Sequence, residues 1–120
     1  MFAHHRKLDN LISFVDANKK QLDGYIKDIN DLGNISEKFA SFGWYAQDVD
    51  GSDIAKIYEA IEKAKEIKKQ PSVIILDTIK GQGLKFVEET MANHHMIFSV
   101  ADHKEADKCI VELENKLKEY

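Results

Sequence analysis

The chain alternates short apolar runs, which are typical of strands, with segments that have the period of an α-helix. Residues 11–16 form a nearly continuous apolar run, which favours a strand covered on both faces, as in a parallel sheet. Residues 44–49 and 72–79 are predicted to form two further strands. The last of them follows Pro71, the single proline, and contains four consecutive apolar residues.

Helical segments separate and follow these strands. Asn34 and Glu37 have capping-box spacing at the start of a short helix that ends near Gly43. A longer helix is predicted to begin after Ser52 as its N-cap and to bury apolar side chains at intervals of three and four residues as far as Ile67. The pattern therefore predicts right-handed strand–helix–strand crossovers and an α/β fold with a parallel sheet.

The carboxyl end of the chain is less regular. Residues 85–99 give no clear pattern, and residues 106–117 return to the helical period. In a parallel sheet, the loops that leave the strands gather at one edge, where ligands of such sheets bind. Those loops are ANKKQLDG (17–24), DGS (50–52) and KGQG (80–83).

Composition restricts the possible partners. The 120 residues fit one modest domain, and they are 43% apolar and 32% charged with a net charge of −4. Lysines are mixed with glutamates and form no basic face, so nucleic acid is not an expected partner. No run is long enough to cross a membrane, and a single cysteine, Cys109, makes a cytoplasmic location the default expectation.

The loop after the first predicted strand is rich in oxygen-bearing side chains. The Asn18 amide oxygen and the neighbouring backbone carbonyls suit a hard cation, Mg²⁺ or Ca²⁺, bound mainly through a phosphorylated ligand. Asp16, Asn18 and Asp23 also suit turn residues that accept hydrogen bonds from their own backbone, and spacing alone favours that interpretation. The KGQG loop is too short for a Walker motif and indicates by itself only a turn that needs positive φ.

Five histidines add a second kind of chemistry. His94 and His95 are adjacent on a loop, where one could contact substrate or move a proton, although surface histidines are the commoner explanation. Their spacing does not fit a helical zinc site.

Three segments together resemble one enzyme family. AHHRKLDNLISFVDANKKQLDG is similar to the transketolase motif AxHxKLDNLIxxVDxNxxQxDG, which holds metal and thiamine diphosphate. EKFASFGWYAQDVDGSDI is similar to EKWxAFGWxxxxVDGHDI, and PSVIILDTIKGQGLKFVEE to PTVIIAKTxKGKGVSFMEN. The resemblance covers almost the whole chain up to about residue 95. It implies a truncated thiamine diphosphate-binding fold, which is a three-layer α/β fold with a mostly parallel sheet and flanking helices.

The resemblance also implies roles for individual residues. Asn18 matches the family asparagine that binds Mg²⁺ (or Ca²⁺) through its side chain, and Lys20 matches a ligand that acts through its backbone carbonyl, so its side chain should matter little. Leu22 matches an apolar residue that packs on the thiazolium ring. His94 matches a histidine that faces substrate and cofactor, with His95 as its rival, because the family's preceding tryptophan is replaced here by Asn93.

Part of the family pattern is missing. Members carry GDG and a following glutamate upstream of the NxxQ loop, and they have a pyrimidine-binding domain or subunit. Residues 1–120 therefore look like the second half of the diphosphate-binding domain. The implied function is transfer of a two-carbon ketol unit between sugar phosphates in the pentose phosphate pathway, within a homo- or hetero-oligomer, and the isolated chain is expected to be inactive.

Two alternatives stay open. The chain could be a non-catalytic remnant or interaction module, in which case the strand at 11–16 should have an unpaired edge and an uncovered apolar face. It could also belong to an enzyme of the deoxyxylulose-phosphate synthase type, which has its motifs in a similar arrangement. The KLDNL and FGW–VDGSD motifs fit transketolase better.

Overall fold

The centre of the molecule is a parallel sheet of three strands. In the computed structural model, which describes residues 1–119, the strand order is β1 (Ile12–Ala17), β5 (Ser72–Asp77) and β4 (Tyr45–Asp50). β5 pairs in parallel with both neighbours. The prediction of a parallel sheet is confirmed, and each strand lies within two residues of its predicted bounds.

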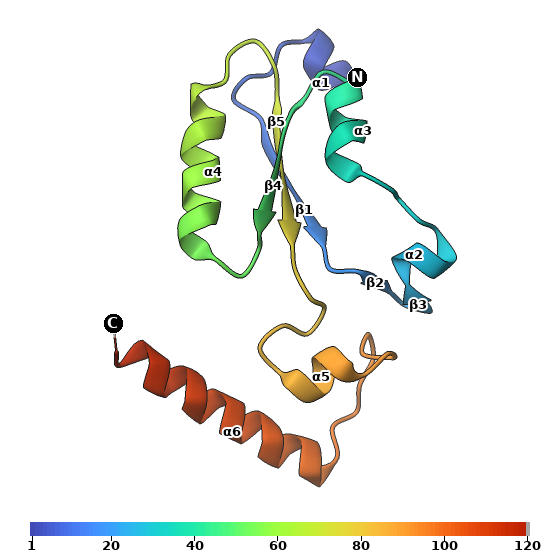
Figure 1. The fold of residues 1–120 in the computed structure, drawn as a ribbon, viewed down its shortest axis with the longest axis vertical. Helices are drawn as coiled ribbons and strands as arrows, with labels where there is room; N and C mark the ends of the chain where they lie inside the picture. Colours follow the sequence, from blue (N-terminus) through green and yellow to red (C-terminus); the bar gives the residue numbers. More distant parts are fainter. Residues whose placement is uncertain (120) are drawn as a thin grey trace.

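Two helices cover opposite faces of this sheet (Figure 1). α3 (Ile35–Ser41) lies in the crossover from β1 to β4, and α4 (Ile54–Glu66) lies in the crossover from β4 back to β5. The first crossover passes over β5 and the second returns in the opposite direction, so right-handed connections place the two helices on opposite faces. The fold is therefore a mixed α/β arrangement of helix, sheet and helix, as expected.

The buried core is centred on β5. Val73 and Ile74 have no exposed surface, and α4 contributes two buried alanines, Ala60 and Ala64. β1, in contrast, lies at the end of the strand order, and Phe14 is 49% exposed. The prediction that the 11–16 strand is covered on both faces is wrong for the described residues, and the alternative expectation of an uncovered apolar face is the one confirmed. An apolar run cannot distinguish a central strand from an edge strand.

The helix caps are mostly where the sequence places them, with one shift. Asn34 caps α3 by accepting a hydrogen bond from the Glu37 backbone N–H (3.0 Å). For α4 the N-cap is Asp53, not Ser52, because the Asp53 carboxylate accepts from the Lys56 N–H (3.1 Å). The Ser52 hydroxyl instead donates to Asp50.

Several short elements were not predicted from the pattern. They are the helices α1 (Phe2–His5), α2 (Ile26–Ile29) and α5 (Lys85–Glu89), and a hairpin of β2 (Lys20–Gln21) and β3 (Gly24–Tyr25). The final helix, α6 (Val100–Leu117), begins earlier than predicted because Ser99 and Asp102 form a capping box. Figure 1 shows α5 and α6 beyond the carboxyl edge of the sheet. Within residues 1–119, the helices are all too short or too polar to cross a membrane.

Candidate functional site

The loops that leave the three strands meet at the carboxyl edge of the sheet. The backbone N–H of Gly51, after β4, donates to the carbonyl of Asp77 at the end of β5 (2.9 Å). The N–H of Lys80, after β5, donates to the carbonyl of Asn18, after β1 (3.3 Å). All three predicted loops therefore lie side by side at one edge, as the parallel sheet requires.

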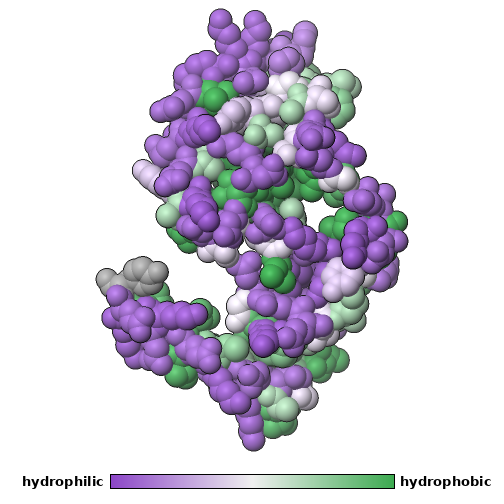
Figure 2. Space-filling view, viewed as in Figure 1, coloured by the Kyte–Doolittle hydropathy of each residue, from purple (hydrophilic) through white to green (hydrophobic). Residues whose placement is uncertain are grey.

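Apolar side chains are exposed around this edge. Figure 2 shows an apolar belt across the middle of the molecule, below a mostly hydrophilic upper surface. The loops after β1 and β5 contribute exposed apolar residues, namely Leu22, Tyr25, Ile29, Leu32 and Ile79. Exposed apolar surface of this kind is characteristic of a ligand or partner site.

Asn18 lies in a tight turn of its own. Its side-chain oxygen accepts from the Lys20 backbone N–H (3.1 Å), and its side-chain nitrogen donates to the carboxylate of Asp16 (2.9 Å). The turn interpretation is thus correct for Asn18. It does not exclude a cation, because an amide oxygen has two lone pairs and this hydrogen bond uses one.

Asp16 is held from both neighbouring loops. Its carboxylate accepts from the Thr78 hydroxyl and from the Asn18 amide, and these two hydrogen bonds, the Thr78 bond first, lower the pKa of Asp16 below its ordinary value of 3.8. A carboxylate that is ionised at neutral pH therefore lies at the base of the oxygen-rich loop. Asp23, the third oxygen-bearing residue, is exposed in the hairpin turn.

The side chain of Lys20 is buried, unlike most lysines. It is 7% exposed, and its ammonium donates to the backbone carbonyls of Glu88 (2.6 Å) and Thr90 (2.9 Å). The sequence assigns no role to this side chain, whereas in the structure it joins the β2–β3 hairpin to the end of α5. The backbone carbonyl of Lys20 stays the predicted metal ligand.

Leu22 occupies the turn between β2 and β3. The two strands pair Gln21 with Gly24, so Leu22 and Asp23 form the two-residue connection. Leu22 is 57% exposed. An exposed apolar side chain at a hairpin tip is available to pack on a ring, which stays a prediction.

The KGQG loop adopts the backbone that its glycines permit. Gly81 and Gly83 both have positive φ (87° and 96°). At Gly81 a Cβ atom would also lie 2.5 Å from the Val87 side chain, so only glycine fits. The N–H of Gly83 donates to the Glu88 carboxylate (2.8 Å), which occupies a donor that a phosphate would otherwise accept from.

His94 is connected to this loop through its ring, whereas His95 contacts His94. The Lys80 ammonium, which can only donate, lies 2.9 Å from Nδ1 of His94. Nδ1 is then the acceptor, so the neutral ring carries its proton on Nε2. The ring of His95 packs edge-on against that of His94 (centroids 4.6 Å apart), and both histidines are exposed.

Asn93, the departure from the family pattern, has a structural role. Its side-chain nitrogen donates to the carbonyls of Lys80 (3.0 Å) and Val87 (2.9 Å). One amide therefore joins the loop after β5, helix α5 and the histidine pair. Neither this connection nor that of Lys20 was predicted from the sequence. In both, a side chain donates to backbone carbonyls, which every residue carries, and most of these carbonyls are distant in the sequence.

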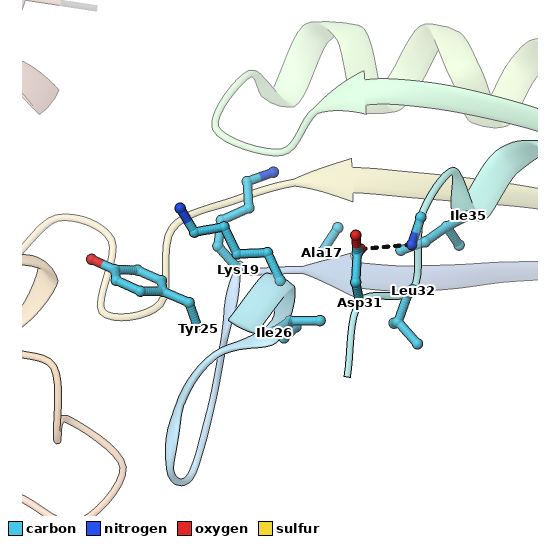
Figure 3. A pocket seen from close by; sticks show the side chains of 9 residues that line it. Ala17, Lys19, Tyr25, Ile26, Asp31, Leu32 and Ile35 are labelled. Atoms are coloured by element: carbon cyan, nitrogen blue, oxygen red, sulfur yellow. Dashed lines mark hydrogen bonds between the residues drawn. The ribbon is translucent and has the colours of Figure 1, made fainter. Parts of the chain in front are cut away.

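A hollow of about 430 Å³ opens beside the oxygen-rich loop (Figure 3). Ala17, Ile26, Leu32 and Ile35 form its apolar part, and Lys19 also lines it. Asn18, Leu22 and His94 do not line it. Lys80 connects Asn18, through its backbone N–H, with His94, through its ammonium, but none of the three lines this hollow.

The donors present fit part of a magnesium site. The Asn18 side-chain oxygen and the Lys20 backbone carbonyl are neutral oxygens of the kind that hard cations accept. Among residues 1–119, His, Cys, Asp and Glu side chains form no group of three that could hold a metal ion. A metal site at Asn18 and the Lys20 carbonyl therefore stays a prediction.

Comparison with known proteins identifies relatives over most of the chain. The family model described as "Transketolase, thiamine diphosphate binding domain" matches residues 1–110. The 6-deoxy-6-sulfo-D-fructose transketolase subunit SqwG of Clostridium sp. (strain MSTE9) is 47% identical over 96 residues, covering 80% of this chain and 35% of the relative. An apulose-4-phosphate transketolase subunit of Actinobacillus succinogenes is 37% identical over 95 residues, covering 79% of this chain and 34% of the relative.

Solved structures give the same result for the fold. A crystal structure of transketolase from Campylobacter jejuni covers 69% of this chain with a TM-score of 0.63 at 30% identity, and the match spans 13% of that protein. A transketolase structure from Pichia stipitis covers 98% of this chain with a TM-score of 0.65 at 22% identity, which supports the fold alone, and the match spans 21% of that protein. The chain spans about a third of the two curated relatives named above.

Proposed function

The chain belongs to the transketolase family, in its thiamine diphosphate binding domain, and we propose from this premise that it forms the second half of such a domain. The complete protein would transfer a two-carbon ketol unit between sugar phosphates. Support comes from the 47% identity with one subunit of a transketolase and from the three strand exits at one edge, which carry the family's motif residues.

Each motif residue receives a proposed role. The Asn18 side-chain oxygen and the Lys20 carbonyl would bind Mg²⁺ (or Ca²⁺), through which the diphosphate is held. Leu22 would pack on the thiazolium ring. Thiamine diphosphate, when bound, supplies the electron sink for cleaving a carbon–carbon bond next to a ketone.

His94 is proposed to contact the substrate. With Nδ1 accepting from Lys80, the ring can donate from Nε2 to a substrate oxygen. His95 is the alternative, and its ring edge meets that of His94. Both side chains follow the loop that is bonded to Asn18, and this supports a histidine segment on the same side of the sheet as the proposed cofactor loop.

We further propose that the chain works only in a larger assembly. An upstream GDG-containing half would supply the charged metal ligand, and a pyrimidine-binding domain or subunit would complete the cofactor site. The exposed apolar residues at the carboxyl edge and the incomplete ligand set of residues 1–119 support this, as do relatives whose names describe them as transketolase subunits.

Calorimetry with thiamine diphosphate and Mg²⁺ tests the proposal. The isolated chain should show no micromolar affinity, and the chain completed by a GDG-containing upstream half should bind. Asn18→Ala should weaken binding by the completed domain at least about tenfold, which is the low end of the effect of losing a group that supports a metal site. Asn115→Ala, on the exposed face of α6, is the matched control and should bind normally. Micromolar binding by the isolated chain, or normal binding by Asn18→Ala, would contradict the proposal.

A second candidate is an interaction module without catalysis. The observation that favours it is the position of β1 at the end of the strand order with Phe14 half exposed. Such a module would associate but would bind no cofactor even when completed by the upstream half, so the same calorimetry separates the two functions.

A further inference from the structure

Lys20 is unusual because it buries a positive charge without an acidic partner. Within residues 1–119, no carboxylate lies within 4.0 Å of its ammonium. Its hydrogen-bond acceptors are two backbone carbonyls, and the ring of Tyr25 lies 5.9 Å away in cation–π geometry. A charged group that leaves water needs well-formed hydrogen bonds, and in this part-buried position the two carbonyls accept them.

The two carbonyls belong to the end of α5. Glu88 lies in the last turn of this helix and Thr90 is its C-cap. Carbonyls at a helix end have no partner within the helix, and a lysine side chain can satisfy them. Lys20 therefore satisfies carbonyls at the carboxyl end of α5, although it precedes the two acceptor residues by 68 and 70 positions in the sequence.

From this end the chain continues directly to the histidines. Asn93 holds the next turn by donating to Lys80 and Val87, and the Lys80 ammonium contacts His94. The Lys80 N–H in turn donates to Asn18. Lys20 thus joins the hairpin directly to the segment that leads to the histidines, and Lys80 adds an indirect connection because it bonds both Asn18, just before the hairpin, and His94.

We propose that the Lys20 side chain is a positioning residue, which fixes the 84–95 segment and with it His94 relative to the β2–β3 hairpin. Lys20 would then act twice, by its backbone carbonyl toward the metal and by its ammonium toward the histidine segment. The role of this connection in catalysis rests on the proposed function, whereas the connection between Lys20 and the 84–95 segment does not.

Hydrogen exchange and NMR on the full 120-residue chain without cofactor test the connection between Lys20 and the 84–95 segment. Lys20→Met keeps the apolar stem and removes the donors. Exchange of the amides of Val87, Glu88 and Thr90, which are bonded within α5, should become about tenfold faster, as expected when charge-assisted hydrogen bonds are lost. The side-chain ¹⁵N resonances of His94 should shift as well, because its contact with Lys80 depends on the same segment.

Lys85→Met is the matched control. Lys85 lies on α5 itself with its side chain 85% exposed, and its ion pair with Glu89 (3.9 Å) is exposed and so contributes little to stability. Removing its charge should leave both readouts within error of the unmodified chain. The amides of Val73 and Ile74, in β5, report whether the sheet stays folded.

Three outcomes would overturn the proposal. They are unchanged α5 exchange in Lys20→Met, equal acceleration in Lys85→Met, and loss of protection across β5 in Lys20→Met, which would make Lys20 a general determinant of folding. Since the samples contain no cofactor, failure here leaves the proposed function standing. Failure of the calorimetric test would likewise leave the proposed connection between Lys20 and the 84–95 segment standing.

Discussion

The hydroxyl of Thr78, which follows β5, donates to the carboxylate of Asp16 in β1. Together with the Asn18 amide, this bond lowers the pKa of Asp16. The two strand exits are therefore joined by side chains as well as by the backbone bond between Lys80 and Asn18. The interaction has a direct consequence for the pH dependence of the loop.

Because the folded-state pKa of Asp16 lies below its ordinary value of 3.8, the stabilisation is fully present above that value. It is lost as the pH falls through the folded-state pKa. Thr78→Val removes the largest of the causes that lower this pKa, so the pKa of Asp16 should rise toward 3.8 in an NMR titration of the carboxyl carbon. Asp102, whose pKa is lowered independently by Ser99, serves as an internal control and should not change. An unchanged Asp16 titration would show that the Thr78 bond is not formed in solution.

Gly43 provides a test of the packing between α1 and the end of α3. Its φ is +82°, and a Cβ atom there would collide with the ring of His4. Gly43→Ala should therefore lower the free energy of unfolding by about 1–2 kcal/mol from the backbone alone, with an added cost from the collision. Urea denaturation followed by Trp44 fluorescence measures this.

Gly33→Ala is the matched control for Gly43→Ala. Gly33 also has positive φ (+56°), but the nearest atom to its Cβ position is 4.0 Å away. It should show the backbone cost without the collision. Equal destabilisation of the two variants would mean that His4 moves aside freely.

Ser72 begins the central strand and has an unsatisfied hydroxyl. It is 1% exposed, and its Oγ has no hydrogen-bond partner among the described residues. Removing a buried polar group that makes no bond recovers its desolvation cost, so Ser72→Ala should leave thermal stability unchanged or raise it by up to about 1 kcal/mol. Val73→Ala, the next residue along, should instead cost about 1–4 kcal/mol as a cavity forms. A clear loss of stability in Ser72→Ala would reveal a bridging water or another partner.

The sequence was sufficient for the parts of the fold that have long periodic patterns. The apolar run at Val73–Leu76 predicted the central strand, and the cap at Asn34 predicted α3. The β2–β3 hairpin was not predictable, because strands of two residues have no period. The same holds for the edge position of β1, since strand order depends on contacts across the whole chain.

Only the parts of the site that lie in short sequence motifs could be predicted. Asn18 and the KGQG loop were identified from sequence motifs, and the structure places their loops side by side. The bonds from Lys20 to Glu88 and Thr90 were not, because a lysine in a polar loop has the same appearance whether its side chain is exposed or buried. Only the fold shows that this one is enclosed.

The uncovered face of β1 predicts that the isolated chain associates with itself. Among residues 1–119, β1 pairs with β5 alone, and Phe14 on β1 is 49% exposed. An unpaired strand edge and an apolar side chain are therefore presented together. Static light scattering on the purified chain should give a mass above 13.7 kDa that rises with concentration. Phe14→Lys should return the mass toward the monomer, because a charge on an edge strand opposes pairing. Phe42→Lys is the matched control, since Phe42 is equally exposed but follows α3, and it should leave association unchanged. A concentration-independent monomer in the unmodified chain would show that this face is covered in solution.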